Sequence, residues 1–106
     1  MTGEVVSVST SVGTPEDARR IATEIVRRRL AACAQISSVD SCYAWKGEIQ
    51  NEREYHIEFK TTAETYPALE AAIRELHPYE LPDIHAVSVD QVFEPYATWV
   101  EEGSSG

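Results

Sequence analysis

The chain has 106 residues, of which 42% are hydrophobic and 25% charged, and this balance predicts one globular domain rather than a disordered chain. Eighteen acidic residues against nine basic ones give a net charge of −9, which disfavours nucleic acids and anionic membrane surfaces as partners. No run of about 18 apolar residues occurs, so no membrane insertion is expected, and the first five residues lack the basic and apolar parts of a secretory leader.

The first elements in the chain are a strand and an amphipathic helix. Residues 4–12 alternate as a strand does, and Gly13 ends the pattern. Thr14 and Pro15 then favour a helix start, because threonine caps a helix and proline fits its first position. If the helical period continues, Arg29 lies on the apolar face of the helix. From there its guanidinium can reach solvent, an anion or a neighbouring subunit. The expected apolar face of this helix carries Ala18, Ile21, Ala22, Ile25 and Val26.

A long antiparallel hairpin is expected next. Residues 33–45 alternate as a strand, Lys46-Gly47 supplies a turn, and the alternation returns up to Lys60. The two strands are too close in sequence for a crossover helix, so they should pair directly. The hairpin should project past the core and present an edge with which a neighbour can pair.

The rest of the chain predicts a helix, a strand and a short final helix. The second helix begins at residue 63 or 65 and ends at His77-Pro78, because proline pushes its predecessor out of the helical region. A loop over 79–83, a strand over 84–89 and an amphipathic turn over 95–100 follow. The expected domain covers 1–102, the polar residues from 101 onward are expected to fray, and 103–106 form a flexible tail.

The order βαββαβ with a short C-terminal helix predicts an α+β, ferredoxin-like sandwich. Its helices should cover one face of the antiparallel sheet. The other face should carry tyrosine, tryptophan and cysteine in alternation with serine, glutamine and glutamate. Such a face is too apolar to remain exposed comfortably, so oligomerisation through the sheet is expected.

Enzyme signatures are missing from the sequence, which has no phosphate loop, GxSxG elbow or HExxH motif. The chain is therefore predicted not to be an enzyme. Cys33 and Cys42 match no zinc-ribbon spacing, and the simplest interpretation is reduced thiols in a cytoplasmic protein.

Metal ligation is the sharper chemical hypothesis, since thiolate and imidazole donors favour copper or zinc. For His77 the alternative is that its imidazole satisfies carbonyls at a helix end. A solvated hairpin face is the favoured interpretation of Glu48, Glu52, Glu54 and Glu58. The credible donors are Cys33, Cys42, His56, His77, His85, Glu80 and Asp83.

Five short motifs occur in order along nearly the whole chain: Ala31-Ala32-Cys33, Tyr43-x-Trp45-x-Gly47-Glu48-Ile49, Lys60-Thr61, His77-Pro78-Tyr79-Glu80-Leu81-Pro82 and Tyr96-x-x-Trp99. Together they resemble the CutA family, the divalent-cation tolerance proteins. The resemblance implies a ferredoxin-like subunit in a compact homotrimer with inward-facing sheets, an architecture similar to that of the PII signalling proteins. It also implies binding of divalent cations, copper in particular, with no established catalytic activity.

The resemblance also supplies expectations for single residues. Cys33, His77 and Glu80 are the candidate metal ligands, for a divalent ion that folding does not require. Lys60 and Tyr79, with Arg29 added from the helical pattern, are the candidates for a ligand cleft. Tyr43, Trp45 and Trp99 are the candidates for subunit contacts or the adjoining cleft. The sequence departs from the family at Ala34-Gln35, where Val-Asn is usual, and at Ala44.

Two other functions remain open at this stage. One is a PII-like sensor in which Arg29 or Lys60 recognises a small anion. The other is an interaction scaffold that uses the surface of the trimer.

Overall fold

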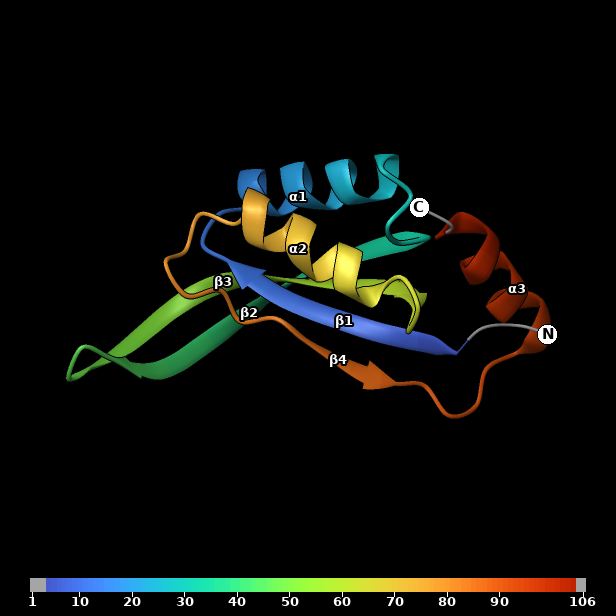
Figure 1. Cartoon of the computed structure of the whole chain (residues 1–106). Helices are drawn as coiled ribbons and strands as arrows, with labels where there is room; N and C mark the ends of the chain where they lie inside the picture. Colours follow the sequence, from blue (N-terminus) through green and yellow to red (C-terminus); the bar gives the residue numbers. More distant parts are fainter. Residues whose placement is uncertain (1–3, 105–106) are drawn as a thin grey trace.

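The computed structural model describes residues 4–104, which form one four-stranded sheet and three helices (Figure 1). The strands lie in the order β2-β3-β1-β4 and every neighbouring pair is antiparallel. This order confirms the ferredoxin-like α+β fold. The elements are β1 (Val5–Val12), α1 (Pro15–Arg27), β2 (Cys33–Trp45), β3 (Glu48–Thr62), α2 (Tyr66–Leu76), β4 (His85–Ser88) and α3 (Glu94–Gly103).

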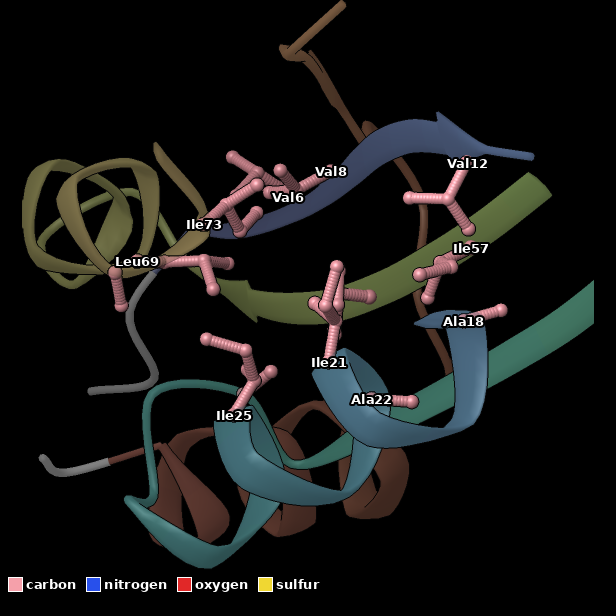
Figure 2. Close-up of a cluster of buried hydrophobic side chains, with 13 residues drawn as sticks. Val6, Val8, Val12, Ala18, Ile21, Ala22, Ile25, Ile57, Leu69 and Ile73 are labelled. Carbon is pink, nitrogen blue, oxygen red and sulfur yellow. The ribbon is translucent and has the colours of Figure 1, made fainter. Parts of the chain in front are cut away.

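The core lies between the sheet and the helices α1 and α2, which cover the same face (Figure 1). As expected, α1 begins with Pro15 after Thr14, whose Oγ1 accepts a hydrogen bond from the Asp17 N–H at 3.1 Å. The three- and four-residue spacing on α1 and α2 presents apolar side chains to those on alternate positions of β1 and β3 (Figure 2). The largest fully buried hydrophobic side chains are Phe59, Ile21, Ile25, Ile57, Leu69 and Ile73.

The β2–β3 hairpin keeps one register over thirteen residue pairs, from Cys33 opposite Lys60 to Trp45 opposite Glu48. Its two-residue turn has positive φ at both positions, 51° at Lys46 and 83° at Gly47. These angles fit the type I′ turn that matches strand twist, and glycine adopts them without steric cost. The far half of the hairpin extends beyond α1 and α2 (Figure 1), which confirms the predicted projection.

The face of the sheet opposite α1 and α2 is open for most of its length (Figure 1). Strand alternation places Ser7, Ser9 and Ser11 of β1 there. Glu58 and Lys60 of β3 share this face. Helix α3 covers only one end, where Ala97 and Val100 pack against Val5. The remaining surface is therefore polar near the centre of the sheet.

Two expectations about chain ends and helix ends are wrong. Arg29 does not continue α1: its φ is 60°, in the left-handed region, and its guanidinium donates to the backbone carbonyl of Glu102. The predicted fraying and flexible tail are contradicted for residues 101–104, because α3 continues to Gly103 and Ser104 is 2% exposed. Ser104 Oγ donates to the carbonyl of Val100 at 2.5 Å, and its own carbonyl accepts the Thr65 hydroxyl at 2.8 Å.

Two stretches lie outside the described residues. They are residues 105–106, the rest of the expected tail, and residues 1–3, which belong to the segment in which no secretory leader is expected. Within the described part of the chain, no helix has the length and apolar character needed to cross a membrane.

Two buried threonines give a test of the core. The Thr10 hydroxyl lies in the core without a hydrogen-bond partner, whereas that of Thr61 donates to the carbonyl of Leu30 at 2.8 Å. An unpaired buried hydroxyl costs about 1–3 kcal/mol, so Thr10→Val should raise the free energy of unfolding by about 1 kcal/mol.

Thr61→Val is the matched control, because it is the same chemical change at an equally buried site that does use its hydroxyl. It should lower the free energy of unfolding, by about 1 kcal/mol or more. Urea denaturation of both variants measures the difference, and equal signs for the two changes would contradict the assignment.

Candidate functional site

A cleft of about 790 Å³ lies between the projecting hairpin and the loop that joins α2 to β4. The hairpin contributes aromatic and polar side chains from β2 and one carboxylate from β3. The loop contributes a tyrosine, two acidic residues, a proline and a leucine. The lining residues are Ser11, Ser41, Cys42, Tyr43, Trp45, Glu54, Pro78, Tyr79, Glu80, Leu81 and Asp83.

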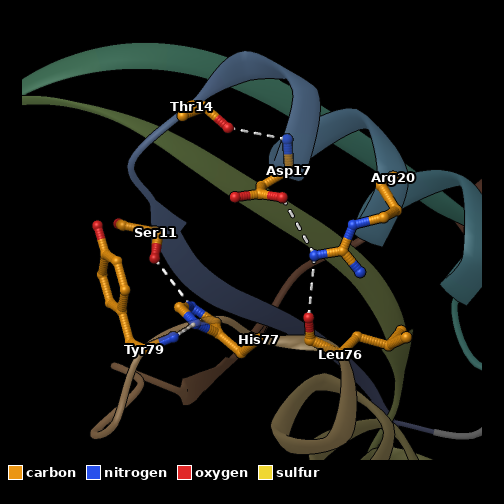
Figure 3. A network of polar contacts seen from close by, with 7 residues as sticks. All are labelled: Ser11, Thr14, Asp17, Arg20, Leu76, His77 and Tyr79. Atoms are coloured by element: carbon orange, nitrogen blue, oxygen red, sulfur yellow. Dashed lines mark hydrogen bonds and ion pairs between the residues drawn. The ribbon is translucent and has the colours of Figure 1, made fainter.

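His77 fixes the start of this loop (Figure 3). Its Nε2 lies 2.9 Å from the carbonyl oxygen of Ser11, and its Nδ1 lies 3.1 Å from the backbone nitrogen of Tyr79. A carbonyl only accepts and an N–H only donates, so the ring is neutral with its proton on Nε2. The imidazole therefore ties β1 to the first residues of the loop.

Burial determines the protonation of His77. The residue is 8% exposed, and this desolvation lowers the pKa of its imidazole below the usual 6.5. Two smaller effects raise the pKa: the hydrogen bond to Ser11, and the nearby carboxylates of Asp83, Asp17 and Glu54. A second proton would also place an N–H on Nδ1 against the Tyr79 N–H. The neutral ring is the form that the structure requires.

A hydrogen bond between Tyr79 and Glu54 joins the loop to the hairpin. The Tyr79 hydroxyl donates to Glu54 Oε2 at 2.6 Å, and burial together with this bond raises the pKa of Tyr79. Glu54 is only 7% exposed. Asp83 Oδ1 accepts the backbone N–H of Ser11 at 3.2 Å, which fixes the other end of the loop against β1. The cleft wall is thus held at both ends.

The opposite wall is the aromatic side of the hairpin. Tyr43 and Trp45 share one face of β2, and each is 38% exposed. The Tyr43 hydroxyl donates to Glu52, which raises the pKa of Tyr43 to about 12. The Lys46 ammonium lies 5.7 Å from the centroid of the Trp45 ring, a cation–π contact at the tip.

A second polar group lies on the open face nearer α3. Glu58 Oε2 accepts from Ser7 Oγ at 2.5 Å and from Lys60 Nζ at 3.0 Å, and these two bonds lower the pKa of Glu58. Cys33 Sγ lies 3.7 Å from the hydroxyl of Tyr96, whose pKa is raised to about 12 by burial first and by the thiol second. Cys33 and Lys60 are direct neighbours across β2 and β3.

The structure places the candidate metal ligands apart within one subunit. Cys33 lies level with Ser7 of β1 through Lys60, whereas His77 contacts Ser11, about 13 Å further along the strand. Among residues 4–104 no three histidine, cysteine or acidic side chains form a group that could hold a metal ion.

The other predicted site residues fall into separate regions. Tyr79 and Glu80 line the cleft, as do Tyr43 and Trp45, but Lys60 and Arg29 do not. Trp99 stacks on Tyr96 of α3, with ring centroids 5.7 Å apart, at the end of the molecule opposite the hairpin tip (Figure 1).

Sequence reasoning missed Glu54 as a site residue. Its interpretation as part of a solvated face is wrong, because the loop after α2 covers it and Tyr79 binds it. The sequence indicates Asp83 only as a metal donor, whereas in the structure it anchors the loop to Ser11. Strand alternation does place Glu54 on the open face, but no local pattern indicates that a loop 25 residues later lies over it.

Comparison with known proteins gives one consistent family. The profile of the CutA1 divalent ion tolerance protein family matches residues 6–103. The Divalent-cation tolerance protein CutA of Thermotoga maritima is 39% identical over 82% of this chain and 86% of its own length. Protein CutA of Mus musculus is 40% identical over 80% of this chain, but the chain spans only about half, 49%, of that relative. The solved structure of the divalent cation tolerance protein of Thermus thermophilus is 34% identical, with a TM-score of 0.91 over 95% of this chain and 99% of that one.

The neutral His77 predicts a pH dependence of stability. Because its pKa is lowered on folding, the unfolded chain binds more protons than the folded one just below pH 6.5. The free energy of unfolding should therefore fall as the pH drops below about 6.5, by up to about 1.4 kcal/mol per pH unit, until the pH passes the folded pKa. Urea denaturation between pH 7 and 5 measures this slope.

His77→Gln should remove the slope, and His85→Gln, a change at an exposed histidine, should keep it. The lowered pKa of Glu58 acts in a separate window, below about pH 4.5. A slope that survives in His77→Gln would contradict the assignment.

Proposed function

We propose a metal-binding role for this chain, which belongs to the CutA1 divalent ion tolerance protein family. In this proposal the protein is a cytoplasmic homotrimer that binds a divalent metal ion, copper in particular, and so contributes to tolerance of such ions. The single observation that carries the proposal is the family match, which extends over residues 6–103.

Assembly into a homotrimer is supported by the surface of the subunit. Among residues 4–104, α3 covers one end of the open sheet face and the loop after α2 covers Glu54, while the rest has no covering layer (Figure 1). Large apolar side chains are exposed around it, and surfaces of this kind mark interfaces. They include Leu81, Val87, Phe93 and Trp99, each at least 50% exposed. Both edge strands, β2 and β4, also have free backbone groups on one side.

A shared metal site follows from the same arrangement. The described residues of one subunit bring no three donors together, so the proposed ion takes donors from more than one subunit. Cys33 is partly exposed and supplies the soft thiolate that copper favours. Glu80 is exposed and supplies a carboxylate from the loop of a neighbour. His77 joins the site only by giving up one of its two present hydrogen bonds.

A second candidate function is a small-molecule sensor. The observation that favours it is the 790 Å³ cleft with its aromatic wall. Arg29 and Lys60, the expected anion-reading residues, do not line this cleft; they contact Glu102 and Glu58.

Native mass spectrometry of metal-stripped protein, followed by titration with Cu²⁺ and Zn²⁺, tests the proposal. A trimer that takes up three ions at low micromolar concentration is the expected result, with Cu²⁺ bound more tightly than Zn²⁺. Cys33→Ser should weaken Cu²⁺ binding at least tenfold, since it removes a direct ligand. Cys42→Ser is the control for the loss of a thiol, because Cys42 is an exposed free thiol that lines the cleft but is not one of the proposed ligands, and it should bind as the parent does.

The outcomes separate the two parts of the proposal. A monomer would contradict the assembly and the shared site together. A trimer that stays metal-free would contradict metal binding, and equal affinities for the two serine variants would contradict the role of Cys33.

A further inference from the structure

Tyr96 of α3 contacts Cys33 of β2, the thiol that the proposed metal site uses. The Tyr96 hydroxyl lies 3.7 Å from Cys33 Sγ, a distance typical of hydrogen bonds that involve sulfur. Among the described residues, this hydroxyl is the one side-chain hydrogen-bond partner of the thiol. The thiolate, not the thiol, binds metal ions, and a thiolate has no proton to donate. In the metal-binding form the Tyr96 O–H therefore donates to the sulfur.

The phenol ring of Tyr96 is held from behind by α3 itself. Trp99, one turn later, stacks on it, with ring centroids 5.7 Å apart and an angle of 21° between the planes. The neighbouring face of α3 is buried, because Ala97 and Val100 pack against Val5 of β1. The hydroxyl therefore approaches Cys33 from a fixed direction.

The C-terminal end of α3 is anchored at the start of β2. Gly103 approaches Ala32, the residue before Cys33, so closely that a Cβ at this glycine would lie 2.8 Å from the Ala32 Cβ. The guanidinium of Arg29 donates to the backbone carbonyl of Glu102 in the same turn of α3. The helix is thus fixed to the segment that immediately precedes the thiol.

The charges beside the thiol leave the sulfur attractive to a cation. Lys60 lies directly opposite Cys33, and its ammonium alone would repel a metal ion. The Lys60 Nζ lies 3.0 Å from Glu58 Oε2, and the Lys60 side chain is only 17% exposed. Because this ammonium and this carboxylate balance each other, the thiolate is left as the net negative charge of the group.

We propose that Tyr96 is a positioning residue of the metal site: its hydroxyl donates a hydrogen bond to the Cys33 thiolate and orients the sulfur, without contacting the ion. Hydrogen bonds to metal ligands typically change metal affinity by about 10- to 100-fold. The inference rests on the proposed metal-binding function and adds a residue outside its ligand set. The group lies on the open sheet face, where the proposed ion takes further donors from a neighbouring subunit, so contact with that subunit is part of the site.

Titration of the metal-stripped trimer with Co²⁺ under argon tests the proposal. Co²⁺ is the probe because a thiolate ligand gives it a sulfur-to-metal absorption band and because it does not oxidise thiols. Tyr96→Phe keeps the ring and its stack on Trp99 but removes the hydroxyl. It should raise the Co²⁺ dissociation constant at least about tenfold. The band should also move to longer wavelength, because the lost hydrogen bond no longer lowers the energy of the sulfur lone pair.

Tyr66→Phe is the matched control, because it makes the same chemical change on α2. The hydroxyl that it removes donates to Glu70 at 2.8 Å, in the helix layer and not on the open face. Its dissociation constant and its absorption band should equal those of the parent. Native mass spectrometry should show a trimer for the parent and for both variants.

A double variant separates positioning from direct ligation. Calorimetry measures the residual Co²⁺ affinity of Cys33→Ser, which has lost the absorption band. Adding Tyr96→Phe to Cys33→Ser should leave this residual affinity unchanged, because Tyr96 acts only through the sulfur. A further loss in the double variant would show that Tyr96 acts independently of Cys33 and would overturn the inference.

Two other outcomes distinguish this inference from the proposed function. Equal affinities and bands for Tyr96→Phe and Tyr66→Phe would overturn the role of Tyr96 and leave metal binding by Cys33 intact. A parent protein that gives no sulfur-to-metal band would overturn Cys33 as a ligand, and the role of Tyr96 with it.

Discussion

The arrangement of the cleft depends on one neutral imidazole. His77 ends α2, donates to the carbonyl of Ser11 and accepts from the backbone of Tyr79 (Figure 3). These two bonds turn the chain from the helix layer toward the open face of the sheet. Tyr79 is thereby placed against Glu54, and the hairpin and the loop become two walls of one cleft. A protonated ring could not make the same pair of bonds, so the geometry requires the lowered pKa that burial produces.

The two faces of the sheet carry residues with different roles. One face, under α1 and α2, holds the apolar core, and its register is fixed because a one-residue shift would expose that core. The other face carries the candidate functional side chains in two groups. Cys33, Glu58 and Lys60 lie near α3, and the residues that line the cleft lie toward the hairpin tip. Since these groups are separated along the strands, a single subunit does not combine their donors. The proposed metal site therefore takes donors from more than one subunit, whereas the residues that line the cleft belong to one chain.

The sequence predicts most of the fold because local physics determines it. Alternation defines β1 and the hairpin, Thr14-Pro15 starts α1, and His77-Pro78 ends α2. Prediction fails where a contact distant in sequence decides the outcome. Polar Glu101 and Glu102 suggested a frayed tail, but Ser104 is buried against Thr65. Likewise, the motif around His77 indicates a site, yet only the folded chain shows that its ring nitrogens bind Ser11 and Tyr79 and that Glu54 lies beneath the loop.

The central claim is that a neutral His77 holds the cleft together, and nitrogen-detected NMR of the imidazole tests it most directly. Long-range proton–nitrogen spectra distinguish the two neutral tautomers and follow the ring through a pH titration. The account predicts a protonated Nε2 and an unprotonated Nδ1 at pH 7, with a pKa below 6.5. A proton on Nδ1, or a pKa above 6.5, would contradict it.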